Sequence, residues 1–295
     1  MNPVIRQRRI SLQETATAYS ANMANLLTGN PRFLNLYEHN VAQLPVTLRF
    51  YNLDNGRTII NNHDDLRTYI AVFAGHHYWK LQTSFNALFQ HLPTNSTIDI
   101  IDYGCGQALA TTVFYDYIIR NNRNLRVDKI ILVEPSDFAL KRGILHLNYF
   151  IDHKDQDTEV KKVNLSLDNL ATTDLTSNNT NTKIHLLSNI LDIDSFNLNT
   201  LATKIRNSQR GTNYFVCVSP TNYNAETRIV HFQNQYVNQN INCINGEIQG
   251  RVFNFSNRTW QNQYPIQMAQ RIFKCNFDAN IARPTTVDDF DDLPF

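Results

Sequence analysis

Two glycines follow directly after a predicted strand and open a predicted helix. The segment Ile98–Tyr103 is mostly apolar, carries Asp102 near its end, and runs through Gly104 and Gly106 into the next predicted element. Glycine lets the backbone pass close to a ligand, and a helix N-terminus presents N–H groups that have no intrahelical partner. We therefore predict a cofactor-binding turn at this position.

A second acidic residue closes the next predicted strand. Glu134 and Pro135 follow the apolar stretch Ile131–Val133, which places the carboxylate at the carboxyl edge of the neighbouring strand, where ribose hydroxyls are usually bound. A nicotinamide-binding turn would require glycine at the sixth position of the motif, and this chain has Leu109 there. The pattern therefore disfavours a dinucleotide.

Together these motifs resemble those of the class I S-adenosylmethionine-dependent methyltransferases. In that family, the acid of the first strand and the glycines after it hold the methionine end of the cofactor, and an acid that closes the second strand takes the ribose diol. Asp102, Gly104, Gly106 and Glu134 match these positions one by one. The resemblance implies S-adenosylmethionine as cofactor and methyl transfer as activity, within a domain of residues 94–280.

Two departures from the family pattern leave alternatives open. Ala108 stands where family members often have a third glycine, and Glu134 lies somewhat farther along the chain than usual. One alternative is a Rossmann-like fold whose glycines only form a tight turn. The other is a non-catalytic, methyltransferase-like adaptor, whose N-terminal helices would fill the cleft with side chains.

The fourth predicted strand ends at Ser188. In methyltransferases this end faces the transferred methyl group, so the resemblance implies that Ser188 and Asn189 contact the cofactor or the substrate, whereas Asp194 and Ser195 are expected to cap the next helix. The segment lacks the Pro-Pro motif of amino-methylating DNA enzymes, and the chain has no Pro-Cys pair for cytosine-C5 chemistry. Small-molecule, protein and RNA acceptors all remain open, and no catalytic residue is assigned. The predicted cofactor-binding set is Asp102, Tyr103, Gly104, Cys105, Gly106, Glu134, Pro135, Ser188 and Asn189.

Alternating strand and helix patterns position these residues. They predict an α/β fold with a doubly wound, mainly parallel sheet of the Rossmann-like type. A terminal antiparallel pair of strands is expected from Val252–Phe255 and Tyr264–Phe277, and residues 171–182 are predicted to be a loop. The other strands are expected at Ile98–Tyr103, Lys129–Val133, Val160–Leu165, Ile184–Ser188 and Tyr214–Val218, with helices at Ala108–Arg120, Asp137–Phe150 and Asp194–Arg206.

Residues 1–93 are predicted to form an N-terminal cap. Residues 1–45 have helical spacing, residues 46–60 suggest a β-hairpin that turns at Asp54–Gly56, and a long helix is expected to open at Asp64 and Asp65. Adjacent histidines on this helix point to different faces, so we expect no shared metal. Its aromatic residues are first expected in the core, with a lid over the sheet edge as the alternative: Tyr69, Phe73, Trp79 and Phe85.

Composition bounds the classes of function. The chain has 295 residues, and 27 Lys and Arg balance 26 Asp and Glu, which argues against a strongly basic nucleic-acid-coating surface. No apolar run approaches the ~20 residues that a membrane span requires. The four cysteines are widely separated, so neither a disulfide scaffold nor a zinc site is indicated. We expect a bacterial-type cytoplasmic protein with reduced thiols.

The last residues form a separate signal. Residues 281–295 are expected to be a disordered tail, because four acids repel one another and Pro294 blocks regular structure. Asp288–Phe295 resembles the acidic tip of bacterial single-stranded DNA-binding proteins, which docks on replication and repair proteins; the resemblance implies an apolar pocket for the phenylalanine and a basic rim for the acids. A solvating tail is the alternative. The expected partner-binding residues are Asp291, Asp292, Leu293, Pro294 and Phe295.

Overall fold

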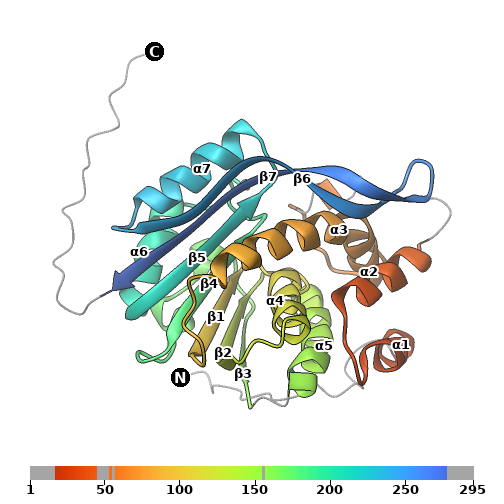
Figure 1. The fold of residues 1–295 in the computed structure, drawn as a ribbon, viewed down its shortest axis with the longest axis horizontal. Helices are drawn as coiled ribbons and strands as arrows, with labels where there is room; N and C mark the ends of the chain where they lie inside the picture. Colours follow the sequence, from red (N-terminus) through yellow and green to blue (C-terminus); the bar gives the residue numbers. More distant parts are fainter. Residues whose placement is uncertain (1–16, 45–52, 55–56, 155–156, 278–295) are drawn as a thin grey trace.

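A single seven-stranded sheet organises the chain (Figure 1). The computed structural model describes residues 17–44, 53–54, 57–154 and 157–277. The strand order is β3-β2-β1-β4-β5-β7-β6; the first five strands are parallel, and β7 is antiparallel to both of its neighbours. The predicted doubly wound α/β class is confirmed. The strands are β1 Thr97–Tyr103, β2 Arg126–Val133, β3 Glu159–Val163, β4 Thr182–Ser188, β5 Gly211–Ser219, β6 Gln239–Asn254 and β7 Thr259–Phe277.

Helices cover both faces of this sheet. One face packs against α3, α4 and α5, and the other against α6 and α7. None of the described helices is both long and apolar enough to cross a membrane. The helices are α1 Thr17–Leu27, α2 Phe33–Ala42, α3 His63–Leu88, α4 Leu109–Arg120, α5 Asp137–Lys154, α6 Leu198–Ser208 and α7 Tyr223–Asn234, and short 3-10 turns lie at Leu167–Asn169 and Thr172–Leu175.

The order of the strands reverses beside β1. The chain winds from β1 to β2 and β3 in one direction, and then crosses to β4 and β5 on the other side of β1. Connections on the two sides of such a point leave the sheet in opposite directions, which opens a crevice at the carboxyl ends of the strands. The residues that follow β1, β2 and β4 therefore meet at one edge.

The N-terminal helices share the main core rather than packing as a separate layer. Met23 of α1, Leu36 of α2 and Phe85 of α3 are fully buried in one cluster with residues of α4, α5 and β1. The contact between α3 and β6 is close, because a Cβ placed on Gly250 would lie 2.4 Å from Cδ1 of Trp79. The indole Nε1 also donates to the carbonyl of Arg251 at 3.0 Å. These contacts fix α3 against β6 on one face of the sheet.

The predicted β-hairpin is wrong at residues 57–60, which the structure describes and which form no strand. Residues 57–60 form a turn and irregular chain, with no strand partner in the described ranges, while residues 46–52 lie outside them. The side chain of Ile60 is buried, and its carbonyl accepts a hydrogen bond from Ser136 Oγ, so this backbone pairs with a side chain instead of a strand. The predicted tail, including all of its partner-binding residues, also lies outside the described residues.

Two helices begin at residues other than those predicted. The N-cap of α3 is Asn62, whose Oδ1 accepts the Asp65 N–H at 2.9 Å, so Asp64 and Asp65 belong to the first turn. The N-cap of α6 is Asn197, whose Oδ1 accepts the Thr200 N–H at 2.9 Å, whereas Asp194 and Ser195 precede it. Both segments carry several residues able to cap, which the pattern alone cannot separate. The helix α7 had not been predicted.

Candidate functional site

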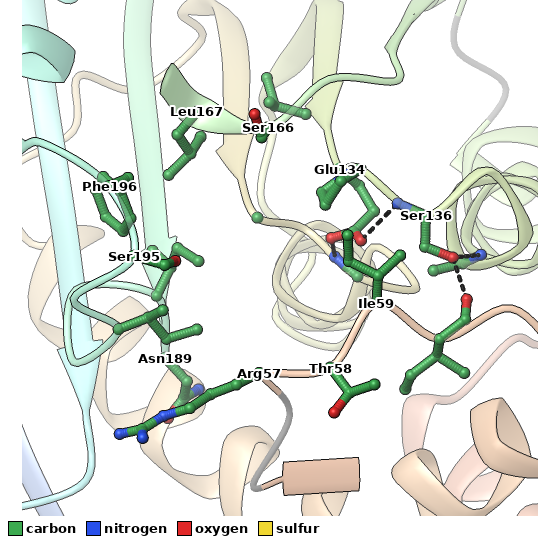
Figure 2. Close-up of a pocket in the computed structure, with 18 of the residues that line it drawn as sticks. Arg57, Thr58, Ile59, Glu134, Ser136, Ser166, Leu167, Asn189, Ser195 and Phe196 are labelled. Carbon is green, nitrogen blue, oxygen red and sulfur yellow. Dashed lines mark hydrogen bonds between the residues drawn. The ribbon is translucent and has the colours of Figure 1, made fainter. Parts of the chain in front are cut away.

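A cavity of about 380 Å³ opens where β1, β2, β3 and β4 end (Figure 2). It lies at the crevice that the strand order creates. Residues 57–60 border it from the N-terminal part of the chain, and Leu66 and Tyr69 line it from α3. Six members of the predicted cofactor-binding set line this cavity: Gly104, Gly106, Glu134, Pro135, Ser188 and Asn189.

Both glycines of the turn occupy positions where a side chain would be unfavourable. Gly104 and Gly106 have φ angles of +60° and +52°, a region that other residues rarely adopt. A Cβ on Gly104 would lie 2.6 Å from Cδ1 of Ile190. A Cβ on Gly106 would meet nothing within 4 Å. At Gly106 the backbone is therefore exposed to the empty space of the cavity, as close approach to a ligand requires.

Glu134 joins the turns that follow β1 and β2. Its Oε2 accepts the N–H of Gly106 at 3.0 Å, and its Oε1 accepts the N–H of Ser136 at 2.9 Å. Burial raises the pKa of this carboxyl, and the two backbone donors act in the opposite direction. A carboxylate oxygen has two acceptor positions, so each oxygen can still receive a hydrogen bond from a ligand hydroxyl.

The wall opposite Glu134 is mainly apolar, with Ser166 and Ser195 beside its apolar side chains. Leu167 and Phe196 lie across the cavity from the carboxylate in Figure 2. Leu165 and Ile193 extend this surface. A ligand with hydroxyl groups at one end and a flat apolar part at the other would match both sides.

Asp102 does not line the cavity. It is 1% exposed, and its Oδ2 accepts both the N–H of Thr111 at 3.2 Å and the Thr111 hydroxyl at 2.7 Å. The N-cap position of α4 is Ala108, which has no side-chain oxygen, so Asp102 satisfies the helix N-terminus in its place. Burial raises the pKa of Asp102 to about 7. In this structure the Asp102 side chain therefore stabilises the turn from its buried side, away from the cavity.

Tyr103 and Cys105 also lie away from the cavity lining. The Tyr103 hydroxyl is 3.0 Å from Nδ1 of His185, within the core on the α6 and α7 side of the sheet. Cys105 is 7% exposed, and burial raises the pKa of its thiol well above the ordinary value. These two residues are packed inside the fold, so their side chains are not among those that a ligand in this cavity would meet.

Asn189 forms the far border of the cavity and is fixed by three hydrogen bonds. Its φ is +56°, and its N–H donates to the carbonyl of Val218 at 2.6 Å. Its Nδ2 donates to Ser188 Oγ at 2.9 Å. Its Oδ1 accepts from Nζ of Lys80 at 2.5 Å. The side chain is thereby held in one orientation between the sheet and α3.

Lys80 is a residue that the sequence did not reveal as part of the site. It is 2% exposed, and burial lowers its pKa to about 7, although Asp192 acts to raise it. It lines a second cavity, of about 520 Å³, between α3 and the strands β6 and β7. Since Asn189 lines the first cavity, the contact between Lys80 and Asn189 separates the two spaces.

One face of α3 contributes side chains to the lining of both cavities. Tyr69 lines the first, and Phe73, His77 and Lys80 line the second. These positions follow helical spacing, so the signal was present in the sequence, but it equally describes a core-facing stripe. Of the four aromatic residues considered as core or lid, Phe85 is fully buried, whereas Tyr69 and Phe73 line cavities. In the described part of the chain, no group of three or more ligating side chains could hold a metal.

Comparison with known proteins finds distant structural likenesses only. No protein-family model matches the chain, and no curated protein matches it. Among solved structures, a proposed class I S-adenosylmethionine-dependent methyltransferase from Listeria monocytogenes is 11% identical with a TM-score of 0.42, covering 94% of this chain and 73% of the other. A methyltransferase from Leishmania major (10%, TM-score 0.38) covers 86% and 90%, and a proposed RNA methyltransferase from Pyrococcus horikoshii (11%, TM-score 0.40) covers 69% and 84%.

Proposed function

We propose that this protein is a methyltransferase that binds S-adenosylmethionine in the cavity beside β1, β2 and β4. The observation that carries the proposal is the carboxylate of Glu134, which bridges Gly106 and Ser136 and faces an apolar wall across an open crevice. The resemblance of the two turns to the methyltransferase family supports the same cofactor.

The polar and apolar groups of the cavity fit the parts of this cofactor. Glu134 can accept hydrogen bonds from ribose hydroxyls, and Leu167 and Phe196 offer an apolar surface for the adenine ring. Oε1 of Gln107 is buried and has no hydrogen-bond partner among the described residues, although the residue lines the cavity. A buried acceptor of this kind is costly unless a ligand donor satisfies it. The ammonium group of the cofactor is such a donor.

The contribution of the protein is mainly orientation. When bound, the cofactor supplies an electrophilic methyl group to a nucleophile. Transfer of this kind gains most from holding the two reactants in a fixed geometry, which needs rigid surroundings rather than an acid and base pair. Asn189 is held by three hydrogen bonds at the border between the cavities, so it is suited to limit how the bound reactants can lie.

Calorimetric titration with S-adenosylmethionine and its demethylated product tests the proposal. Glu134→Gln removes the charge that would receive ribose hydroxyls, and hydrogen bonds to charged groups contribute ~1.5–3 kcal/mol, so affinity should fall by about 10- to 100-fold. Glu159→Gln is the matched control, because Glu159 begins β3 at the opposite sheet edge and pairs with Lys129. Absence of heat with either ligand in the natural protein would reject the cofactor assignment.

The adaptor alternative is less well supported by the geometry. An adaptor was expected to have its cleft filled by N-terminal side chains. Leu66 and Tyr69 of α3 contribute to the wall of the first cavity but leave about 380 Å³ open. The open space favours ligand binding.

A link to DNA metabolism rests on the sequence of Asp288–Phe295 alone. We propose that this segment binds the tip-binding pocket of a replication or repair protein. A labelled eight-residue peptide with a free carboxylate should bind a tip-binding exonuclease or helicase with affinity of micromolar order, and binding should weaken with salt. The peptide without Phe295 is the control, and equal binding by both peptides would mean that the likeness is compositional only.

A further inference from the structure

The second cavity has the size and the surface of a small-molecule site. Its volume of about 520 Å³ lies within the range of ~300–1,000 Å³ that such sites occupy. Aromatic rings from three elements line it: Phe73 of α3, Phe253 and the following Phe255 from β6 and its end, and Tyr264 of β7. No Asp or Glu is present among the described lining residues. The walls therefore favour a flat, largely apolar molecule without a positive charge.

Three nitrogen bases in the lining have lowered pKa values. Burial is the main cause of a lowered pKa at His76, His77 and Lys80, all on α3. Asp192, in the loop after β4, is the carboxylate that opposes the shift at Lys80. The β6 and β7 side of the lining contributes Tyr264 as its titratable group. A nucleic-acid acceptor would call for a set of cations at this surface, and the described lining supplies only Lys80.

Lys80 is positioned to act on a ligand in this cavity. Its amine donates to Asn189 Oδ1, which fixes the nitrogen at the border with the first cavity. The side chain is 2% exposed, so water does not compete for it freely. Gln261 also lines the cavity, and its buried Oε1 has no hydrogen-bond partner in the described part of the chain. That acceptor is available to a polar hydrogen on the ligand.

We propose that the cavity between α3, β6 and β7 binds a small aromatic molecule that carries a hydroxyl group, and that Lys80 removes the hydroxyl proton. The O–H bond breaks and its electron pair stays on oxygen, while the proton bonds to the lone pair of Nζ. The products are an aryl oxide and an ammonium group in contact. This inference rests on the proposed function, because an aryl oxide beside Asn189 is the nucleophile that a methyltransferase would require.

The proton transfer can be observed without the cofactor. 4-Nitrophenol absorbs differently as phenol and as phenolate, so a titration at the pKa of the free probe, where a substantial part of Lys80 is neutral, reports the ionisation of the bound form. In the natural protein the phenolate-to-phenol ratio of the bound probe should exceed that of the free probe by about tenfold, which corresponds to one pKa unit. Lys80→Met should bind the probe mainly as phenol. Lys80→Gln keeps a hydrogen-bond donor for Asn189 but removes the base, so it should also bind the probe mainly as phenol. It keeps the test valid if Lys80→Met does not fold.

Three controls make the result specific. Lys183→Met removes another fully buried lysine, whose Nζ donates to the carbonyls of Asn179 and Arg210, and it should leave the spectrum of the bound probe unchanged. 4-Nitroanisole, which lacks the O–H group, should compete with the probe. Val72→Phe narrows the cavity and should weaken binding of both compounds.

Two outcomes would overturn the proposal. One is that neither 4-nitrophenol nor 4-nitroanisole binds, or that Val72→Phe has no effect on their binding. The other is that the bound probe has the same phenolate fraction in the natural protein, Lys80→Met and Lys80→Gln. Failure of the methyltransferase assignment is separate, since it would appear as absent binding of S-adenosylmethionine while the spectral change of the probe persists.

Discussion

Replacing Gly106 by alanine separates the role of the turn in folding from its role in binding. The φ of +52° is costly for alanine, by ~1–2 kcal/mol, and the lower entropy of the unfolded alanine chain offsets ~0.4–1 kcal/mol of this. No atom lies within 4 Å of the added Cβ, so no steric term increases the cost. We expect a net loss of about 1 kcal/mol in the free energy of unfolding, or ~2–4 °C in Tm.

The same methyl group should have a larger effect on ligand binding. It would project from Gly106 into the space that the cofactor is proposed to fill, and overpacking by one methyl group costs ~1–3 kcal/mol. Affinity for S-adenosylmethionine should therefore fall by about 5- to 150-fold.

Gly29→Ala is the matched control. Gly29 has a φ of +87°, an added Cβ would likewise meet nothing within 4 Å, and the residue lies between α1 and α2, outside the cavity lining. Thermal unfolding followed by circular dichroism should give similar losses for the two variants, and calorimetry should show weaker binding only for Gly106→Ala. Unchanged affinity in Gly106→Ala would refute the placement of the cofactor against this turn. If Gly106→Ala lowers the free energy of unfolding much more than Gly29→Ala does, the added methyl group must meet a steric clash, which would contradict the open space seen at Gly106.

Two further predictions concern stability. Gly250→Ala should destabilise the fold by ~1–3 kcal/mol because its Cβ would collide with Trp79, whereas Gly246→Ala on the same strand meets nothing within 4 Å and should be close to neutral in urea unfolding. For Asp102, burial raises the folded-state pKa from 3.8 to about 7, so the folded protein keeps a proton that the unfolded chain has released within this window. The free energy of unfolding should therefore fall as pH rises from about 4 to 7, and Asp102→Asn should reduce this fall; an identical pH dependence in both proteins would contradict the assignment.

The positions of the parallel strands along the chain and the position of the turn could be predicted because both are encoded locally. A run such as Ile98–Tyr103 is apolar enough to be buried on both faces, and the glycines that follow it have few structural uses. The prediction of a β-hairpin was wrong because it rested on a local signal alone. Asp54–Gly56 is a local turn signal, but a hairpin also needs two strands that pair, and the buried carbonyl of Ile60 is satisfied by Ser136, far away in the sequence.

The role of Lys80 could not be predicted because its burial depends on distant segments. A lysine on a helix is ordinarily solvent-exposed. Here the strands β6 and β7 cover that face of α3, and Trp79 anchors them through the carbonyl of Arg251, at a separation of 172 residues. At Asp102 the structure shows a local role that the motif does not indicate. The local motif indicated a ligand contact, but the alanine at position 108 leaves the start of α4 without a side-chain cap, and Asp102 supplies it.

The helix α3 gives the two cavities a common wall. Tyr69 and Lys80 are eleven positions apart, which corresponds to about 16 Å along a helix, yet they line different spaces. Two contacts one helical turn apart hold the same face of the helix: the ring of Tyr37 would lie within 3 Å of a Cβ on Gly75, and Trp79 packs closely on Gly250. A single rigid element therefore sets the distance between the proposed cofactor and the proposed acceptor. Since alignment of the two reactants is what methyl transfer needs most, the packing of α3 is as much part of the site as the turn after β1.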